Sequence, residues 1–216
     1  MSMELKNKIE DMLSLQEKIN SQINPNWREN NNLWYRAIWT ECAEFVDHIG
    51  WKWWKKQVLN LDQAQIELVD IWHFGLSDLL QWNIDIDKII NIIDQSYFDA
   101  VNQVTLDKSD LLAQSEVFLE NTIISKRFDV KSFIVLLQKS QLDIDKLYKL
   151  YIAKNILNSF RQNNGYKTGE YIKIWNGKED NEYLHEILNN LVENKENNLV
   201  ERLYSELDSI YKLLDK

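Results

Sequence analysis

The sequence predicts an all-α protein. Only one proline and five glycines occur among its 216 residues, so few positions interrupt helix formation. Apolar residues recur at spacings of three and four over long segments, which is the period of a helix that buries one face. Segments that alternate polar and apolar residues between turn signals, as half-buried strands do, are scarce. We therefore expect a multi-helix bundle that forms a single domain over residues 1–216.

The individual helices follow from the apolar spacing and from the residues that end each stretch. The first is expected over residues 3–22, before Pro25, and the second over residues 33–49, before Gly50. Asp62 and Gln65 have the spacing of a capping box, so the next helix is expected to begin there and to continue to Trp82. Further helices are predicted over residues 85–103, 109–125, 130–140, 143–160, 180–193 and 198–214.

One segment departs from the helical pattern. Residues 161–181 read "RQNNGYKTGEYIKIWNGKEDN" and contain three of the five glycines, with tyrosines and a tryptophan between them. A loop of this length inside a compact domain is usually functional or disordered. Aromatic residues among the glycines favour an ordered segment, so we expect a functional loop here.

Charge and composition exclude several classes of protein. The net charge of −9 argues against a broad nucleic-acid-binding surface, although a nucleotide can still be a small ligand. Cys42 is the single cysteine, so an internal disulfide cannot form. The charged N-terminal segment lacks the apolar run of a signal peptide, and no stretch of about 18 apolar residues predicts a membrane span. A cytoplasmic protein is expected, without a nucleic-acid or membrane partner.

Two pairs of carboxylates carry the strongest chemical signal. Glu41 and Glu44 share a face of one predicted helix, and Glu67 and Asp70 share a face of the next. An isolated pair of this kind is usually the solvated side of a helix. Here, however, no lysine or arginine lies three or four residues from any of the four, and the surrounding sequence is rich in tryptophan and aliphatic residues. Clustered carboxylates in such surroundings need either a cation or a raised pKa. For a cation, oxygen ligands alone suit Mg²⁺ or Mn²⁺.

The two pairs and their surroundings resemble a known family. E-x-x-E followed by E-x-x-D is the metal signature of the all-α NTP pyrophosphohydrolases, which include MazG-type enzymes. "ECAEFVDHIGWKWWK", "IELVDIWHF" and "YIAKNILNSFRQNNGYKTGEYIKIWNGKEDN" resemble the dimeric all-α dUTPases in particular. The similarity runs from about residue 10 to residue 185 and is weakest over residues 83–140.

The resemblance implies an activity and a set of metal ligands. It implies an α-helical homodimer that hydrolyses dUTP, and dUDP as well, to dUMP in a Mg²⁺-dependent reaction. Such an enzyme keeps uracil out of DNA and supplies dUMP. Glu41, Glu44, Glu67 and Asp70 match the metal ligands, and either Glu41 or Glu44 would also orient or deprotonate the attacking water.

Candidates for binding the base and sugar lie in the first three helices and the connector "WKWWKK". Gln16 and Asn20 offer the donors and acceptors that the edge of uracil requires. His73 is a candidate for touching the sugar or base, Phe74 for stacking on it or excluding a 2′-hydroxyl, and Trp54 for walling the base pocket. All of these residues have plain structural alternatives as surface polar groups or core aromatics.

Candidates for binding the phosphates carry positive charge or lie near the glycines. Lys52 and Lys55 can neutralise phosphate oxygens, and Arg161 can bind two of them at once. The segment over residues 161–181 is expected to close over the triphosphate and expel water. The remaining candidates near or within it are Asn155, Tyr166, Lys167 and Lys173.

Two other functions fit part of the pattern. A related pyrophosphohydrolase that acts on another nucleotide, such as dCTP, would share the chemistry and differ in the base-binding residues. A non-catalytic helical protein could bind a cation or a basic partner in its acidic groove. That second alternative explains the carboxylates but not Arg161 and the Gly/Tyr/Lys segment, which suit phosphate.

Overall fold

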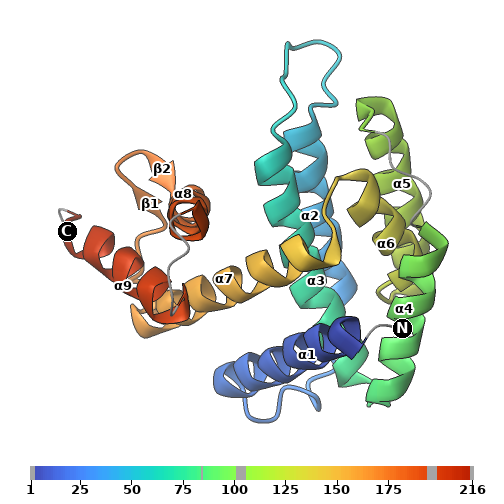
Figure 1. Ribbon diagram of the computed structural model, residues 1–216, viewed down its shortest axis with the longest axis horizontal. Coiled ribbons are helices and arrows are strands. Elements are labelled where there is room, and N and C mark those ends of the chain that lie inside the picture. Colours follow the sequence, from blue (N-terminus) through green and yellow to red (C-terminus); the bar gives the residue numbers. More distant parts are fainter. Residues whose placement is uncertain (1–2, 84, 101–105, 194–198, 215–216) are drawn as a thin grey trace. The chain divides into compact units, whose positions relative to one another are not determined.

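The computed structural model of the protein describes residues 3–83, 85–100, 106–193 and 199–214 (Figure 1). Helices make up most of these residues, which confirms the predicted all-α class. The chain divides into two compact units, Met1–Tyr148 and Lys149–Lys216, and each is described by itself. The prediction of a single domain stays a prediction. None of the described helices is both long and apolar enough to span a membrane.

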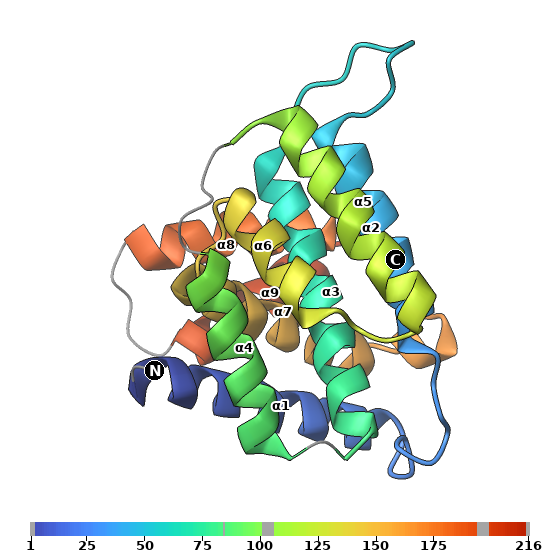
Figure 2. The same ribbon diagram turned by 90° about the vertical axis from the view of Figure 1, so that its right-hand side faces the viewer.

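The first unit is a bundle built around one buried helix. In α3, every residue from Ala64 to Gln81 is buried except Asp70 and Phe74, which are half-buried. This helix packs along α2 and also contacts α1, and α2 contacts α5 in turn (Figure 2). The helices that lie wholly in the unit are α1 (Met3–Ile23), α2 (Trp34–Ile49), α3 (Leu61–Gln81), α4 (Ile86–Ala100), α5 (Lys108–Ser125) and α6 (Val130–Lys139).

The observed ends of α2 and α3 confirm one predicted helix boundary signal and contradict another. Gly50 ends α2 as predicted, because its φ of +83° is a conformation that glycine adopts without strain. The predicted capping box is wrong: Asn60 caps α3, its side chain accepting a hydrogen bond from the Gln63 backbone N–H at 3.3 Å. Gln65 is buried instead, and its amide donates to the Ser140 carbonyl at 2.8 Å. Because the Gln65 side chain makes this core contact, it is not available to form the capping box.

The second unit contains the segment that departed from the helical pattern. The helix α7 (Ile144–Asn163) begins in the first unit and continues past residue 160, where we expected it to end. A short 3₁₀ helix, η1 (Tyr166–Thr168), follows, and then the antiparallel strands β1 (Ile174–Trp175) and β2 (Lys178–Glu179). The sequence did not predict this hairpin, which is only two residues long on each side. The helices α8 (Asp180–Glu193) and α9 (Leu199–Lys212) complete the unit.

Candidate active site

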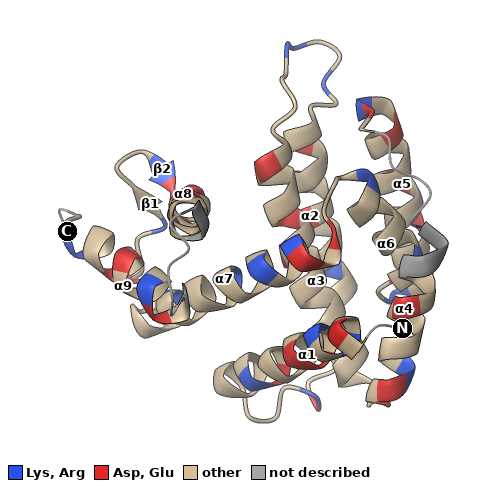
Figure 3. Ribbon diagram, viewed as in Figure 1, with Lys and Arg blue, Asp and Glu red and all other residues tan. Residues whose placement is uncertain are grey.

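Three of the four predicted carboxylates meet between α2 and α3. One oxygen from each of Glu41, Glu67 and Asp70 lies within 4.8 Å of the others. Glu67 is buried and the other two are half-buried. Figure 3 shows acidic residues in red along α2 and α3, and basic residues in blue in the loop that joins them. Because like charges repel strongly where water is partly excluded, this arrangement favours a hard cation with oxygen ligands.

The fourth carboxylate, that of Glu44, lies one turn further along α2. It is exposed and does not belong to the group of three oxygen donors. Its predicted role as a metal ligand stays a prediction.

A histidine that was not among the predicted site residues, His48, touches this cluster. His48 Nε2 lies 3.3 Å from Glu67 Oε1. The hydrogen bond to the Glu67 carboxylate raises the pKa of His48, against the opposing effect of burial. His48 follows Glu41 by seven residues, so the helical period already placed the two on one face of α2.

The predicted base-binding residues of α1 and α3 form one buried hydrogen-bonded network. Gln16 Nε2 donates to Asn20 Oδ1 at 3.0 Å and to Ser77 Oγ at 2.9 Å. Asn20 Nδ2 also donates to Ser77 Oγ at 2.9 Å, and His73 Nδ1 lies 2.8 Å from Gln16 Oε1. Sequence reasoning missed Ser77, although its position four residues after His73 places the two on the same face of α3.

Phe74 and Asp70 are the two half-buried positions within the otherwise buried stretch of α3. The Phe74 ring stacks on Trp34 of α2, with 6.1 Å between ring centroids and 28° between their planes. Asp70 belongs to the carboxylate cluster one turn earlier. The exposed parts of α3 therefore present a carboxylate and then an aromatic ring, next to the amide network.

The predicted residues of the loop between α2 and α3 are held in that loop. The Lys52 ammonium group pairs with Asp47 rather than with a carboxylate of the cluster. Trp54 is 57% exposed, and its ring contacts the edges of Trp51 and Trp53. Lys55 is exposed. The structure thus gives these three candidates no position at the cluster, and their roles stay predictions.

The guanidinium group of Arg161 is bound to a carboxylate that the sequence reasoning did not single out. Arg161 Nε donates to Asp180 Oδ2 at 2.8 Å, and Nη2 donates to Asp180 Oδ1 at 2.7 Å. Asp180 is fully buried, and the Tyr171 hydroxyl donates to it at 2.8 Å. The fork that was predicted to bind phosphate thus holds the first residue of α8 in this structure.

The other predicted phosphate-binding residues near the glycines also lie in the second unit. Tyr166 and Lys167 are exposed on η1, with the Arg161 guanidinium carbon 5.8 Å from the centre of the Tyr166 ring. Lys173 pairs with Glu179 at 3.0 Å. The buried Nδ2 atom of Asn155 has no hydrogen-bond partner among the described residues.

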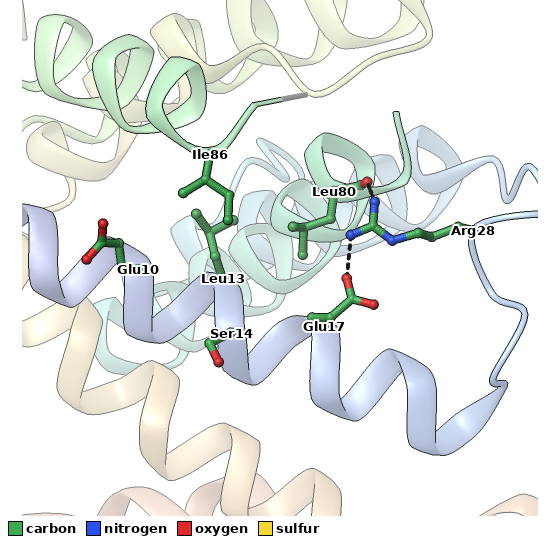
Figure 4. A pocket seen from close by; sticks show the side chains of 7 residues that line it. All are labelled: Glu10, Leu13, Ser14, Glu17, Arg28, Leu80 and Ile86. Atoms are coloured by element: carbon green, nitrogen blue, oxygen red, sulfur yellow. Dashed lines mark hydrogen bonds and ion pairs between the residues drawn. The ribbon is translucent and has the colours of Figure 1, made fainter. Parts of the chain in front are cut away.

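Two hollows of about 440 Å³ lie elsewhere in the first unit. One, between α1, α3 and the start of α4, contains Arg28, which binds Glu17 at 2.5 Å and the Leu80 carbonyl (Figure 4). The other lies between α2 and α5 and includes Cys42 and Lys52. Neither is lined by the carboxylate cluster, and the charge of Arg28 is already matched within the first hollow. The carboxylates remain the candidate active site.

Comparison with known proteins identifies the family of the chain. A family model described as dUTPase matches residues 8–166 of the 216-residue chain. That range includes the amide network, the carboxylate cluster and the whole of α7. No curated protein matches the chain. Because the family model covers well over half of the sequence, and the helical fold fits the all-α type, the chain belongs to the dUTPase family and is a dUTP diphosphatase.

Proposed function

We propose that Glu41, Glu67 and Asp70 hold Mg²⁺, which Mn²⁺ can replace, and that hydrolysis of dUTP to dUMP depends on this metal. The observation that carries the proposal is the approach of three carboxylate oxygens to within 4.8 Å of one another. Carboxylate ligands without histidine or cysteine suit a hard cation. When bound, such a cation neutralises phosphate charge and lowers the pKa of a bound water.

The first pair of glutamates has two proposed tasks, which are metal binding and activation of the attacking water. Glu41 belongs to the cluster, whereas Glu44 is exposed one turn away. We propose that Glu44 completes the metal site and that either Glu41 or Glu44 orients or deprotonates the attacking water. A carboxylate performs this task by accepting a proton from the water as the water attacks.

The remaining candidates would bind the nucleotide. Gln16, Asn20 and His73 would bind the base. Phe74 would lie against the sugar and exclude a 2′-hydroxyl group. Residues 161–181 would close over the triphosphate, and dUDP would be accepted as well. The proposed phosphate-binding and pocket-wall residues are Lys52, Trp54, Lys55, Asn155, Arg161, Tyr166, Lys167 and Lys173. A cytoplasmic homodimer is the proposed working form.

A panel of nucleotides with and without metal tests this proposal. Turnover of dUTP, dUDP, dCTP, dTTP and UTP is measured in Mg²⁺, in Mn²⁺ and in EDTA, and the products are identified. We expect dUMP from dUTP and dUDP in both metals and no turnover in EDTA. Undiminished hydrolysis of dUTP in EDTA would contradict the metal proposal. Turnover of dCTP in preference to dUTP would instead contradict the proposed base specificity while leaving the metal site standing.

A further inference from the structure

Ser77 is a fully buried hydroxyl group whose hydrogen-bonding capacity is completely used. Its oxygen accepts one hydrogen bond from the Gln16 amide and one from the Asn20 amide, both at 2.9 Å. Its proton is donated to the His73 carbonyl, also at 2.9 Å. A hydroxyl group offers one donor and two acceptor positions, so every position of Ser77 is occupied.

This arrangement fixes the direction of each hydrogen bond in the network. The two hydrogens of the Gln16 amide go to Asn20 Oδ1 and Ser77 Oγ. Gln16 Oε1 can only accept, so the nitrogen 2.8 Å from it, His73 Nδ1, must be the donor. In the neutral imidazole the other nitrogen, Nε2, then carries the lone pair and is the acceptor.

The opposite orientation of the amides is chemically unfavourable. Turning Gln16 alone would place its oxygen against the oxygen of Asn20, and turning Asn20 alone would place two NH₂ groups against each other. Turning both would point two carbonyl oxygens at Ser77, whose single proton is already donated to the His73 carbonyl. The orientation with both NH₂ groups on Ser77 is therefore the one in which each group has a matching partner.

We propose that Ser77 is a positioning residue that sets the base specificity of the enzyme by fixing the proton of His73 on Nδ1. The inference rests on the proposed function of Gln16, Asn20 and His73 in binding the base. The acceptor at His73 Nε2 matches the N3–H donor of uracil. Cytosine carries a lone pair at N3, so two acceptors would face each other.

The position of the network along α3 fits this role. Ser77 follows Asp70 by seven residues, which corresponds to about 10 Å along the helix axis. His73 lies between them, one turn from the carboxylate cluster. Metal-binding carboxylates, His73 and Ser77 thus follow one another on α3 in the order in which a nucleotide presents its phosphates and its base.

The tautomer of His73 can be observed directly in the wild-type protein. The chain has three histidines, so ¹⁵N-histidine labelling and long-range ¹H–¹⁵N spectra at a pH where the rings are neutral give three ring patterns. The pattern missing from a His73→Asn variant identifies His73. We expect a protonated Nδ1 and an unprotonated Nε2. A protonated Nε2 would overturn the inference. The NMR measurement does not depend on whether a Ser77 variant folds.

Kinetics of a Ser77→Ala variant test the consequence for specificity. We expect the preference for dUTP over dCTP, measured as the ratio of kcat/KM or from the Ki of dCTP, to fall about tenfold, mainly through a higher KM for dUTP. Ser140→Ala is the matched control, because Ser140 is equally buried and its hydroxyl donates to the Leu136 carbonyl at 2.8 Å, while the Gln65 amide binds the backbone carbonyl of Ser140, which the substitution keeps. The control should keep the wild-type ratio.

The outcomes separate this inference from the proposed function. If the wild type prefers dUTP and Ser77→Ala keeps the full preference, the positioning role is wrong while the proposed site stands. If both serine variants lose the same activity toward both nucleotides, Ser77 has only a structural role and the inference is again wrong. If substitutions of Gln16 and Asn20, the residues proposed to contact the base, leave the KM for dUTP unchanged, the proposed base site itself is wrong.

Discussion

The buried carboxylate of Glu67 is the residue on which the metal proposal can be tested most sharply. It lies within 4.8 Å of two other carboxylate oxygens, so replacing it with glutamine removes a ligand and also relieves repulsion between like charges. We expect Glu67→Gln to lower kcat/KM for dUTP about 100-fold or more. Without metal, its melting temperature should equal or exceed that of the wild type.

A variant elsewhere on the surface controls for the change in charge. Glu120→Gln on α5 alters an exposed glutamate outside the cluster and should leave both activity and melting temperature unchanged. A large loss of stability in metal-free Glu67→Gln would show that the Glu67 carboxylate supports the fold, through its contact with His48, rather than a metal.

The different surroundings of Glu41 and Glu44 predict different kinetic defects. Glu41 belongs to the cluster, so Glu41→Gln should raise the Mg²⁺ concentration needed for half-maximal activity about tenfold or more. Glu44 is exposed and lies outside the group of three, so Glu44→Gln should raise that concentration less than Glu41→Gln does, and it should also lower kcat. Metal titrations of the two variants at saturating dUTP make the comparison. Wild-type activity in Glu44→Gln would remove Glu44 from the site.

The sequence could predict the carboxylates but not the partners of several other polar residues. Spacing of three along each helix predicted a shared face for each pair, and Glu41, Glu67 and Asp70 do approach one another, but the spacing did not indicate that Glu44 lies outside this group. The amide partner of Ser77, Gln16, lies 61 residues away, and the partner of Asp180, Arg161, lies 19 residues away. Only the packing of one helix against another identifies them.

At the level of the elements, α3 depends on a close contact at Gly75. A Cβ atom there would lie 2.7–2.8 Å from ring carbons of Phe128, which precedes α6. We expect Gly75→Ala to lower the free energy of unfolding by about 1–2 kcal/mol, since overpacking outweighs the better helix propensity of alanine. Urea denaturation of Gly75→Ala, Phe128→Leu and the double variant should show favourable coupling of about 1 kcal/mol. Strict additivity would contradict the contact.

At the start of α3, two residues have the spacing of a capping box but do not form one. Asp62 and Gln65 have the right spacing, but the core contact of Gln65 with the Ser140 carbonyl is available only in the folded chain. The cap is Asn60, so Asn60→Ala should cost about 1 kcal/mol of stability, measured by urea denaturation. Asp62→Asn, which keeps that cap, should cost only a few tenths of a kcal/mol. Equal losses would argue against the cap.

The sequence did not indicate the division into two units, because a continuous helix spans the boundary between them. The boundary between Tyr148 and Lys149 falls inside α7, which runs from Ile144 to Asn163. No proline, glycine or polar linker marks that point, so the usual signals of a domain boundary are missing there. The hairpin of β1 and β2 was missed for a related reason, since two-residue strands are too short to show alternation.

Hydrogen exchange across the whole molecule can distinguish metal binding from closure of residues 161–181. The carboxylate cluster lies entirely in the first unit, so Mg²⁺ alone should slow exchange in α2 and α3 and leave α8 and α9 unchanged. Adding the non-hydrolysable α,β-imido analogue of dUTP should extend protection to residues 161–181, because ordering over the triphosphate removes their amides from solvent. The Glu67→Gln variant should lose the response to Mg²⁺. Protection of residues 161–181 by Mg²⁺ alone would contradict closure driven by the nucleotide, and no added protection with the analogue would contradict closure altogether.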